Sequence, residues 1–372
     1  LKTVVSEIPA DMAVGPVKKA IDNLMKALKT DNQEVKLDAL DVLYDILSRF
    51  GTLVNSYHAD LQASFSSELN AKRDPIRKRA ITCLAELSVH TNDKLFDELM
   101  QVVHKNIEKH ISGGEELRTY IQLTSATSKV VGQRLGKYLT QLVPLLMKAT
   151  DEISENESGE ANDEVREYIM QAFDSFVVRC PDQIAKHIEL ILILAKEYLE
   201  YDPNYSYDSS DGEEAEDDED EDMGDDEEED DEDEMGLGGD DDGGNMSDDD
   251  DISWKVRRAA AKCIGSLIRS RPELLDFLYK ELCSTDDYIL PQRFKEREEP
   301  VRLDIFQIFI DLLSQTVTHT THSTGEVTVA QRDEIKYVQQ TKNIIMSRLK
   351  KMLKEKSQKT RLGAFQVLRA LT

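Results

Sequence analysis

A repeated pair of residues, an apolar residue (threonine in the last copy) followed by Lys or Arg, limits the fold of this chain more strongly than any other feature. Positions four, eight and eleven residues after the first member are all apolar in six of the seven copies, whereas the third copy has Ser125 and Ser128. These offsets lie on one face of a helix with 3.6 residues per turn, so the pattern predicts seven amphipathic helices. The basic members, which we call the basic ladder, are Lys36, Arg77, Arg118, Arg166, Arg257, Arg302 and Arg361.

Another amphipathic segment precedes the predicted helices, with examples that start at Val17, Phe96, Leu135 and Ile335. The ladder residues are 41, 41, 48, 91, 45 and 59 positions apart. The long interval shortens to about 41 if a roughly 50-residue acidic segment is an insertion, and helix pairs of roughly this period are typical of HEAT repeats. We therefore predict an all-α, HEAT-repeat superhelical solenoid of about seven helix pairs, with a disordered acidic insertion inside the fifth.

One segment carries the excess negative charge. The chain has 74 acidic and 46 basic residues, a net charge of −28, and 28 of the acidic residues lie between Asp208 and Asp251, where there is no Lys or Arg. Without these 28, the remaining 46 acidic residues equal the 46 basic ones. Like charges repel, and Asp, Glu and Gly bury little apolar surface, so we expect this segment to be disordered. The predicted organisation is a repeat block over 1–201, an acidic loop over 202–252 and a continuing repeat block over 253–372.

The sequence has no motif for catalysis, metal binding or membrane insertion. Its four cysteines are far apart and lack CxxC spacing, which argues against a zinc site or a disulfide framework and indicates a reducing compartment. No apolar run approaches the roughly 18 residues of a membrane span, and no nucleotide-binding, nucleophile-elbow or EF-hand pattern occurs. We therefore expect no enzymatic activity, no cofactor and no metal. The chain begins with Leu1 and ends inside a helical pattern at Thr372, so we expect a piece of a longer protein.

Several residues beside the acidic segment are candidates for partner contact or modification. Trp254 opens a predicted helix, where packing is favoured over a role as a ligand platform. Tyr205 and Tyr207 lie beside a Pro-Asn turn where the preceding helix ends, and the sequence leaves open whether they pack there or contact a partner. Ser210 and Ser247 each precede an acidic residue by three positions, the pattern that acidophilic kinases modify, and each phosphate would add up to about two negative charges. For the basic ladder, pairing with carboxylates of the same or the adjoining repeat is favoured over binding of phosphate or an acidic partner.

The stretches on both sides of the acidic segment resemble one protein family. The segment "LEYDPNYSYD" is followed by the acidic run and then by "ISWKVRRAAAKCI". The stretches "RTYIQL", "VREYIMQAF", "SFVVRCP" and "RFKEREEPVRLDIF" also run in the family's order. The chain is thereby similar, over essentially its whole length, to the cullin-associated, neddylation-dissociated proteins, and the similarity implies their N-terminal region.

This resemblance implies a non-enzymatic assembly and exchange factor for cullin–RING ubiquitin ligases. Family members wrap around a cullin and its RING-finger subunit when the cullin is not neddylated, cover the neddylation region and promote exchange of substrate-receptor modules. The implied partners are the cullin C-terminal region and the RING subunit, without nucleic acid or membrane, for a monomeric protein of the cytoplasm and nucleus. Two other classes stay open: a HEAT-repeat nuclear transport receptor, and a chaperone that binds basic proteins through its acidic loop.

Overall fold

Helices account for all regular structure in the described part of the chain. The computed structural model describes residues 10–155, 160–203, 252–284, 289–322 and 329–371. Within these ranges, all regular elements are α-helices or 3-10 helices, and none is a strand. The predicted all-α class is therefore confirmed. The predicted disorder of the acidic insertion concerns residues 204–251, which lie outside the described ranges.

The described helices form seven consecutive pairs, as the repeat predicted. The pairs are α2 (Ala10–Ala27) with α3 (Gln33–Phe50), α4 (His58–Glu68) with α5 (Asp74–His90), α6 (Asp93–Lys109) with α7 (Glu115–Val131), α8 (Leu139–Glu155) with α9 (Glu160–Arg179), α11 (Ile188–Leu199) with α12 (Ser253–Ser270), α13 (Leu275–Cys283) with α15 (Glu299–His322), and α16 (Val329–Met352) with α17 (Gln358–Leu371). Short elements connect them: α10 (Pro181–Ile184), α14 (Ile289–Gln292), η1 (Gly51–Tyr57), η2 (Gly132–Tyr138), η3 (Ala185–His187), η4 (Pro272–Leu274) and η5 (Arg293–Lys295). Each ladder residue lies in the first two turns of a second helix.

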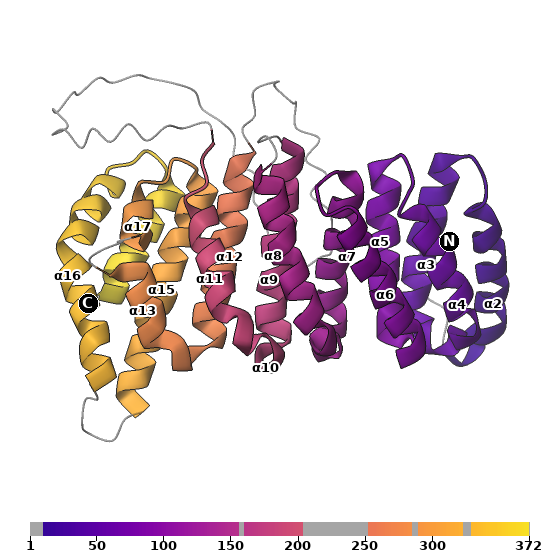
Figure 1. Ribbon diagram of the computed structural model, residues 1–372, viewed down its shortest axis with the longest axis horizontal. Coiled ribbons are helices and arrows are strands. Elements are labelled where there is room, and N and C mark those ends of the chain that lie inside the picture. The colour runs from indigo at the N-terminus through magenta and orange to yellow at the C-terminus, as the bar shows by residue number, and fades with distance from the viewer. Residues whose placement is uncertain (1–9, 156–159, 204–251, 285–288, 323–328, 372) are drawn as a thin grey trace.

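The second helices form one row along the molecule. In the order α3, α5, α7, α9, α12, α15 and α17, each packs against the next, and Figure 1 shows the resulting elongated stack with the chain ends far apart. The acidic segment joins α11 to α12, the two helices of the fifth pair. Because α12 packs directly against α9, the row is continuous across the insertion.

Local sequence signals explain where several helices begin. The Asn32 side chain accepts hydrogen bonds from two backbone N–H groups of α3, at 3.0 and 3.2 Å, and so caps the free donors of the first turn. Asn92 caps α6 through one N–H group at 3.0 Å. Gly113 and Gly114 have φ angles of 118° and 95°, a region that residues with a Cβ rarely adopt, so the turn before α7 requires glycine.

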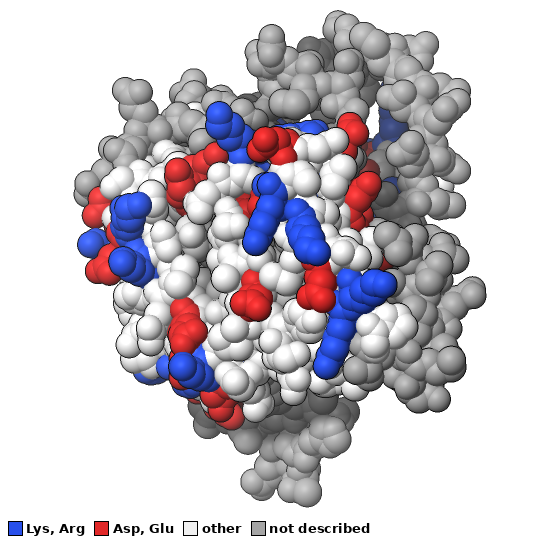
Figure 2. Space-filling view, turned by 90° about the vertical axis from the view of Figure 1, so that its right-hand side faces the viewer, with Lys and Arg blue, Asp and Glu red and all other residues white. Residues whose placement is uncertain are grey.

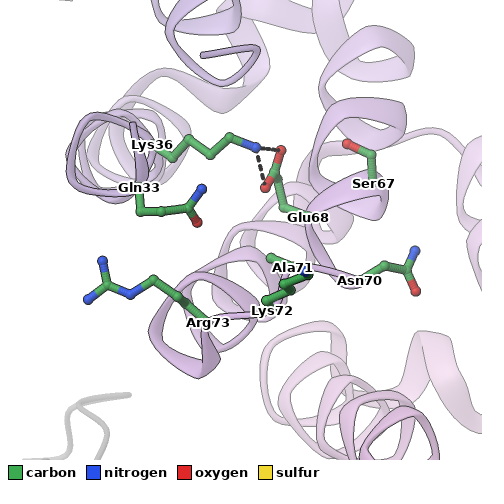
Figure 3. Close-up of a pocket in the computed structure, with 8 residues that line it drawn as sticks. All are labelled: Gln33, Lys36, Ser67, Glu68, Asn70, Ala71, Lys72 and Arg73. Atoms are coloured by element: carbon green, nitrogen blue, oxygen red, sulfur yellow. Dashed lines mark hydrogen bonds and ion pairs between the residues drawn. The ribbon is translucent and has the colours of Figure 1, made fainter. Parts of the chain in front are cut away.

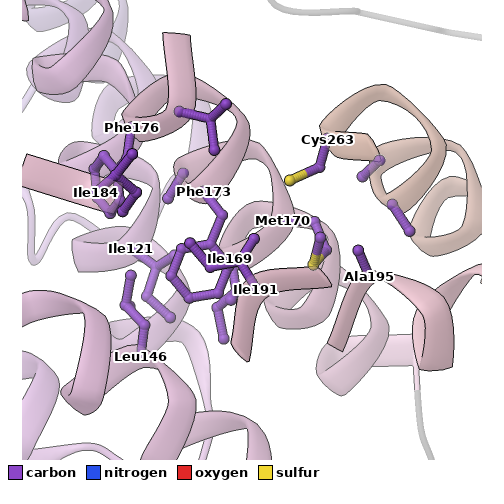
Figure 4. Close-up of a cluster of buried hydrophobic side chains, with 14 of the residues drawn as sticks. Ile121, Leu146, Ile169, Met170, Phe173, Phe176, Ile184, Ile191, Ala195 and Cys263 are labelled. Atoms are coloured by element: carbon purple, nitrogen blue, oxygen red, sulfur yellow. The ribbon is translucent and has the colours of Figure 1, made fainter. Parts of the chain in front are cut away.

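The apolar stripe predicted from the repeat forms a continuous core between the first and second helices. Figure 4 shows its middle, where Ile121 of α7, Phe173 of α9 and Cys263 of α12 are completely buried. Full burial of an aliphatic or phenyl side chain stabilises the fold by roughly 1.5–3 kcal/mol. In the third copy, Ser125 and Ser128 take the stripe positions and are buried too. The stripe therefore faces the neighbouring helices even where it is polar.

The surface near the N-terminal end carries charges of both signs. Figure 2 views this end and shows Lys and Arg side chains interspersed with Asp and Glu over a mainly uncharged surface. Among the helices of the described ranges, none combines the length and the apolar character needed to cross a membrane.

Candidate interaction site: the charged edge at the base of the acidic insertion

The basic ladder follows the edge of the solenoid where the two helices of each pair are joined. At its first position, the Lys36 ammonium lies 2.8 and 3.0 Å from the two carboxylate oxygens of Glu68, the last residue of α4. Figure 3 shows this ion pair beside an open polar hollow of about 540 Å³, which Arg73 and neighbouring side chains line. The ion pair links the first helix pair to the second.

The next two ladder residues connect three successive pairs. Arg77 lies 3.0 Å from the Asp74 carboxylate and also forms an ion pair with Glu115 at the start of α7. Arg118 forms an ion pair with Glu164 of α9 and lies 4.0 Å from Asp74. Because each guanidinium reaches a carboxylate of the following pair, the charges bind neighbouring repeats to each other.

Arg166 contacts the chain just after the end of α11. Its buried guanidinium lies 2.9 Å from the Asp163 carboxylate and 4.9 Å from the ring centroid of Tyr201, within the range of a cation–π interaction. The Tyr201 hydroxyl donates to the same Asp163 carboxylate at 2.7 Å. These three side chains hold the end of α11 just before the acidic segment begins.

Arg257, the most buried ladder residue, lies where the chain re-enters the solenoid. Its side chain is 0% exposed, and its Nε and Nη2 donate to the two carboxylate oxygens of Glu296, each at 3.1 Å. Its Nη1 donates to the Tyr201 carbonyl oxygen at 3.1 Å and to the Ser253 hydroxyl at 3.0 Å. A buried guanidinium is costly unless it is fully hydrogen-bonded, and this bidentate arrangement satisfies it. Arg257 thereby ties the start of α12 to the end of α11.

Two further arginines complete this cluster. Arg293 of η5 donates through Nε to the Leu199 carbonyl oxygen at 2.8 Å, and Arg297 Nη2 lies 3.1 Å from the Asp202 carboxylate. The partners are 94 and 95 positions apart, so the repeat pattern gave no signal for them, although both arginines lie in the stretch "RFKEREEPVRLDIF". We call this group, which holds the two ends of the acidic segment against the sixth pair, the exit clamp; its members are Arg257, Arg293, Glu296 and Arg297.

The last two ladder residues donate to carbonyl and hydroxyl oxygens, whereas carboxylates were expected. Arg302 donates to the Glu296 carbonyl oxygen at 3.0 Å and to the Thr360 hydroxyl at 3.1 Å. Arg361 donates to the Glu355 carbonyl oxygen at 2.8 Å. In both cases the acceptor carbonyl lies six residues earlier, in the turn that precedes the second helix. The arginine therefore links the start of that helix to the turn between the two helices of its own pair.

Glu299 extends the charged edge to the last pair. Its carboxylate accepts a hydrogen bond from the Thr360 hydroxyl at 2.6 Å and another from the Ser357 hydroxyl. Burial raises the pKa of Glu299, but these two hydrogen bonds and the nearby Arg302 charge outweigh it and hold that pKa below its ordinary value. The ionised carboxylate thus joins the start of α15 to the start of α17.

The remaining candidate residues lie beside the exit clamp or outside the described ranges. Trp254 is half-buried and packs against the core, and its ring centroid lies 5.8 Å from the Lys255 ammonium. Outside the described residues lie Tyr205, Tyr207, Ser210 and Ser247.

The described residues contain no cluster of metal ligands and no exposed thiol. Among them, no three or more His, Cys, Asp or Glu side chains are grouped so as to hold a metal ion. All four cysteines are buried, and burial raises the pKa of the Cys180 thiol to about 11 and that of Cys283 to about 12. These two thiols therefore stay protonated and unreactive near neutral pH.

Comparisons with known proteins give a relationship that covers the whole chain. No family model matches it. The chain is 37% identical over 378 residues to Cullin-associated NEDD8-dissociated protein 1 of Arabidopsis thaliana, and 39% identical over 378 residues to that of Dictyostelium discoideum. It is 35% identical over 381 residues to Cullin-associated NEDD8-dissociated protein 2 of Mus musculus. Each match covers 100% of this chain but only 28% or 29% of the relative, so the chain spans less than a third of their length.

Similar solved structures include two of Kap95p. Kap95p in a structure with RanGDP has a TM-score of 0.56 at 11% identity, and the match covers 100% of this chain and 38% of the Kap95p chain. Yeast importin-β (Kap95p) has a TM-score of 0.54 at 13% identity, and the match covers 100% of this chain and 38% of importin-β. These likenesses establish the solenoid fold alone, which confirms the predicted architecture. Over its whole length, the chain is a homologue of part of the cullin-associated NEDD8-dissociated proteins.

Proposed function

We propose that this chain is a cullin-binding segment of a non-enzymatic scaffold. The observation that carries the proposal is its homology, at 35–39% identity over its full length, to proteins named for cullin association and NEDD8 dissociation. The preferred target is an unneddylated cullin–RING ubiquitin ligase, bound at the cullin C-terminal region and the RING subunit. Binding there covers the neddylation region and promotes exchange of substrate-receptor modules. We also propose that the chain acts as a monomer, in the cytoplasm and nucleus, without nucleic acid or membrane.

A stack of helix pairs is physically suited to this task. Each pair contacts mainly its neighbours, so a partner can be bound over several repeats while the frame flexes slightly at every interface. The ladder and exit-clamp side chains are engaged in contacts within the solenoid, as in Arg257 with Glu296. The exposed faces of the helices and turns are therefore the surfaces left for a partner. Exchange of receptors then requires only that receptor binding and solenoid binding oppose each other by about 1–3 kcal/mol.

Capture of a purified cullin–RING complex tests this proposal. The immobilised chain is incubated with the unmodified complex and, in parallel, with the same complex after neddylation. We expect selective capture of the unmodified form, because the NEDD8 tag occupies the region that the solenoid would cover. Equal capture of both forms, or capture of neither, contradicts the proposal.

The same assay separates the two other classes of function. A nuclear transport receptor would bind the GTP-bound form of the transport GTPase, and its support here is the fold likeness to Kap95p at only 11% identity. An acidic chaperone would lose its target when residues 208–251 are deleted, and the isolated segment would compete for histones. A chain without 208–251 that still selects unmodified cullin–RING favours the scaffold proposal over the chaperone.

A further inference from the structure

An open polar hollow lies where the first helix pair meets the second. It measures about 540 Å³ and lies between the start of α3 and the turn that joins α4 to α5. Figure 3 shows Gln33 and Lys36 on the α3 side, and Arg73 extending from the turn toward the same helix. Protein sites that hold a ligand commonly measure roughly 300–1,000 Å³. The hollow is therefore large enough for two or more side chains of a partner.

The residues that line the hollow carry more positive than negative charge. Lys36, Lys72 and Arg73 are cations, and Glu68 is the one carboxylate among the lining residues. Both oxygens of Glu68 accept hydrogen bonds from the Lys36 ammonium, and the two side chains are only 9% and 17% exposed. Because this pair neutralises itself, the charges of Lys72 and Arg73 remain uncompensated in the hollow.

Lys72 and Arg73 have no carboxylate of their own. Both residues are exposed, and within the described ranges neither side chain forms an ion pair or a hydrogen bond. The turn before α3 contains Asp31, but the Asp31 carboxylate forms no ion pair with another described residue. Neighbouring cations repel each other, and a bound anionic group would relieve that repulsion. The hollow thus presents two cations that are free to bind a ligand.

The sixth pair shows what a cation at this turn position does when a carboxylate is within reach. Arg77 and Arg302 each donate to the carbonyl oxygen six residues earlier, at 2.7 and 3.0 Å, so the turns of the second and sixth pairs correspond. In this register, Arg297 takes the position of Lys72. Arg297 lies 3.1 Å from the carboxylate of Asp202, which follows α11 of the fifth pair. A cation at this position therefore binds a carboxylate from outside its own pair.

We propose that the hollow binds an acidic segment of a partner protein, with one carboxylate on Arg73 and a neighbouring carboxylate on Lys72. The planar guanidinium of Arg73 suits two parallel hydrogen bonds to a carboxylate, whereas the Lys72 ammonium supplies a point charge. The Gln33 amide donates to the Asp31 carbonyl oxygen at 3.2 Å and keeps a second N–H for the ligand. A segment bound in this way contacts both α3 and the following turn, so it fastens the first pair to the second.

Binding of a fluorescein-labelled hexaglutamate peptide to the whole chain tests the proposal. Fluorescence anisotropy is measured at about 0.1 M salt, where a Debye length of about 10 Å screens the distant charges of the chain. We expect saturable binding, and Lys72→Glu with Arg73→Glu should weaken it about fivefold or more, because two ion pairs are lost and replaced by repulsion. Lys72→Gln with Arg73→Gln should give an intermediate loss, because it removes the attraction without adding repulsion. Circular dichroism verifies that each variant is folded.

Lys18→Glu with Lys19→Glu in α2 is the matched control. These two lysines are also adjacent in the sequence but do not line the hollow. Their reversal makes the same change in net charge and should alter the peptide affinity less than about twofold. Equal losses in the two charge-reversed chains, or no saturable binding to the unaltered chain, overturn the proposal.

Two small competitors distinguish a carboxylate site from a phosphate site. Glutarate, a dicarboxylate, and inorganic phosphate carry similar charge near neutral pH, and each is titrated against the bound peptide. We expect glutarate to displace the peptide at least as effectively as phosphate does. Displacement by phosphate at a clearly lower concentration would assign the hollow to phosphate groups and overturn the proposal. None of these outcomes depends on cullin binding.

Discussion

Arg257 is buried at the point where the chain re-enters the solenoid, and its guanidinium has a dedicated carboxylate in Glu296. The pair is almost fully shielded, with side-chain exposures of 0% and 2%. In such a place, the attraction between the charges mainly offsets the cost of removing both from water. Loss of one partner is therefore far more damaging than loss of both.

We expect Arg257→Met to lower the free energy of unfolding by about 3–5 kcal/mol, because it leaves the Glu296 carboxylate buried and unpaired. Addition of Glu296→Gln should recover part of this loss. Arg258→Met is the control: Arg258 pairs with Asp304 at 3.2 Å but is 40% exposed, and its loss should cost less than about 1 kcal/mol. Chemical denaturation followed by circular dichroism measures all three, and equal costs for the two arginines would disprove the argument.

Glu299 gives the charged edge a dependence on pH. Its pKa is lower in the folded chain, so the ionised carboxylate stabilises the fold above its unfolded pKa of about 4.3, and this stabilisation disappears as pH falls through the folded pKa. Glu299→Gln should therefore cost roughly 1 kcal/mol near neutral pH, allowing for partial exposure, and progressively less below about pH 4. Unfolding free energies of both chains across this range provide the measurement. A difference that is constant with pH would contradict the assignment.

Among the helices, α17 depends on close approach to α15. A Cβ at Gly363 would lie 2.7 Å from Cδ2 of Phe306, a ring that is 1% exposed and cannot move aside. Helix propensity favours alanine by about 1 kcal/mol, but overpacking costs about 1–3 kcal/mol. Close packing of α17 on α15 therefore favours glycine at this position.

We expect Gly363→Ala to lower the thermal midpoint of unfolding, because the clash outweighs the gain in helix propensity. Gly265→Ala in α12 is the matched variant, since the nearest atoms to its added methyl group all belong to the guanidinium end of Arg269, a flexible side chain that is 51% exposed. That change should raise the midpoint through propensity alone. Scanning calorimetry of the two variants should give shifts of opposite sign, and shifts of the same sign would refute the steric explanation.

The second helices were predictable from sequence, whereas some first helices and the exit clamp were not. In the second helices, apolar residues recur at offsets of four, eight and eleven, the last of which is Ile46 in the first copy and Leu312 in the sixth. This spacing has the helical period, so it predicted the second helices. By contrast, α4 has sparse apolar residues, chiefly Leu61 and Phe65, and gave no clear period. The exit clamp depends on side chains more than 90 positions apart, such as Arg293 and Leu199, which only the folded stack brings together.

At the scale of the whole molecule, the row of second helices passes the acidic insertion without a break. The direct packing of α9 on α12 and the exit clamp together explain this, because they fix both ends of the insertion independently of what lies between them. Net charge alone would have suggested an acidic protein, but the repeats outside 208–251 are balanced. The architecture is therefore set by the repeats rather than by the acidic residues.

Replacement of residues 204–251 by a five-residue Gly-Ser linker should leave the helical signal per molecule unchanged. Closure of the shorter loop is easier by about 2 kcal/mol, so the free energy of unfolding should stay the same or rise. Circular dichroism and small-angle scattering of the two chains test this expectation. Loss of helical signal or a change in the length of the particle would mean that the segment supports the stack.

The direct contact of α9 with α12 also has a practical use. We therefore expect a fluorescent domain placed between positions 203 and 252 to leave the stack intact. Such an internal reporter would follow any bending of the solenoid.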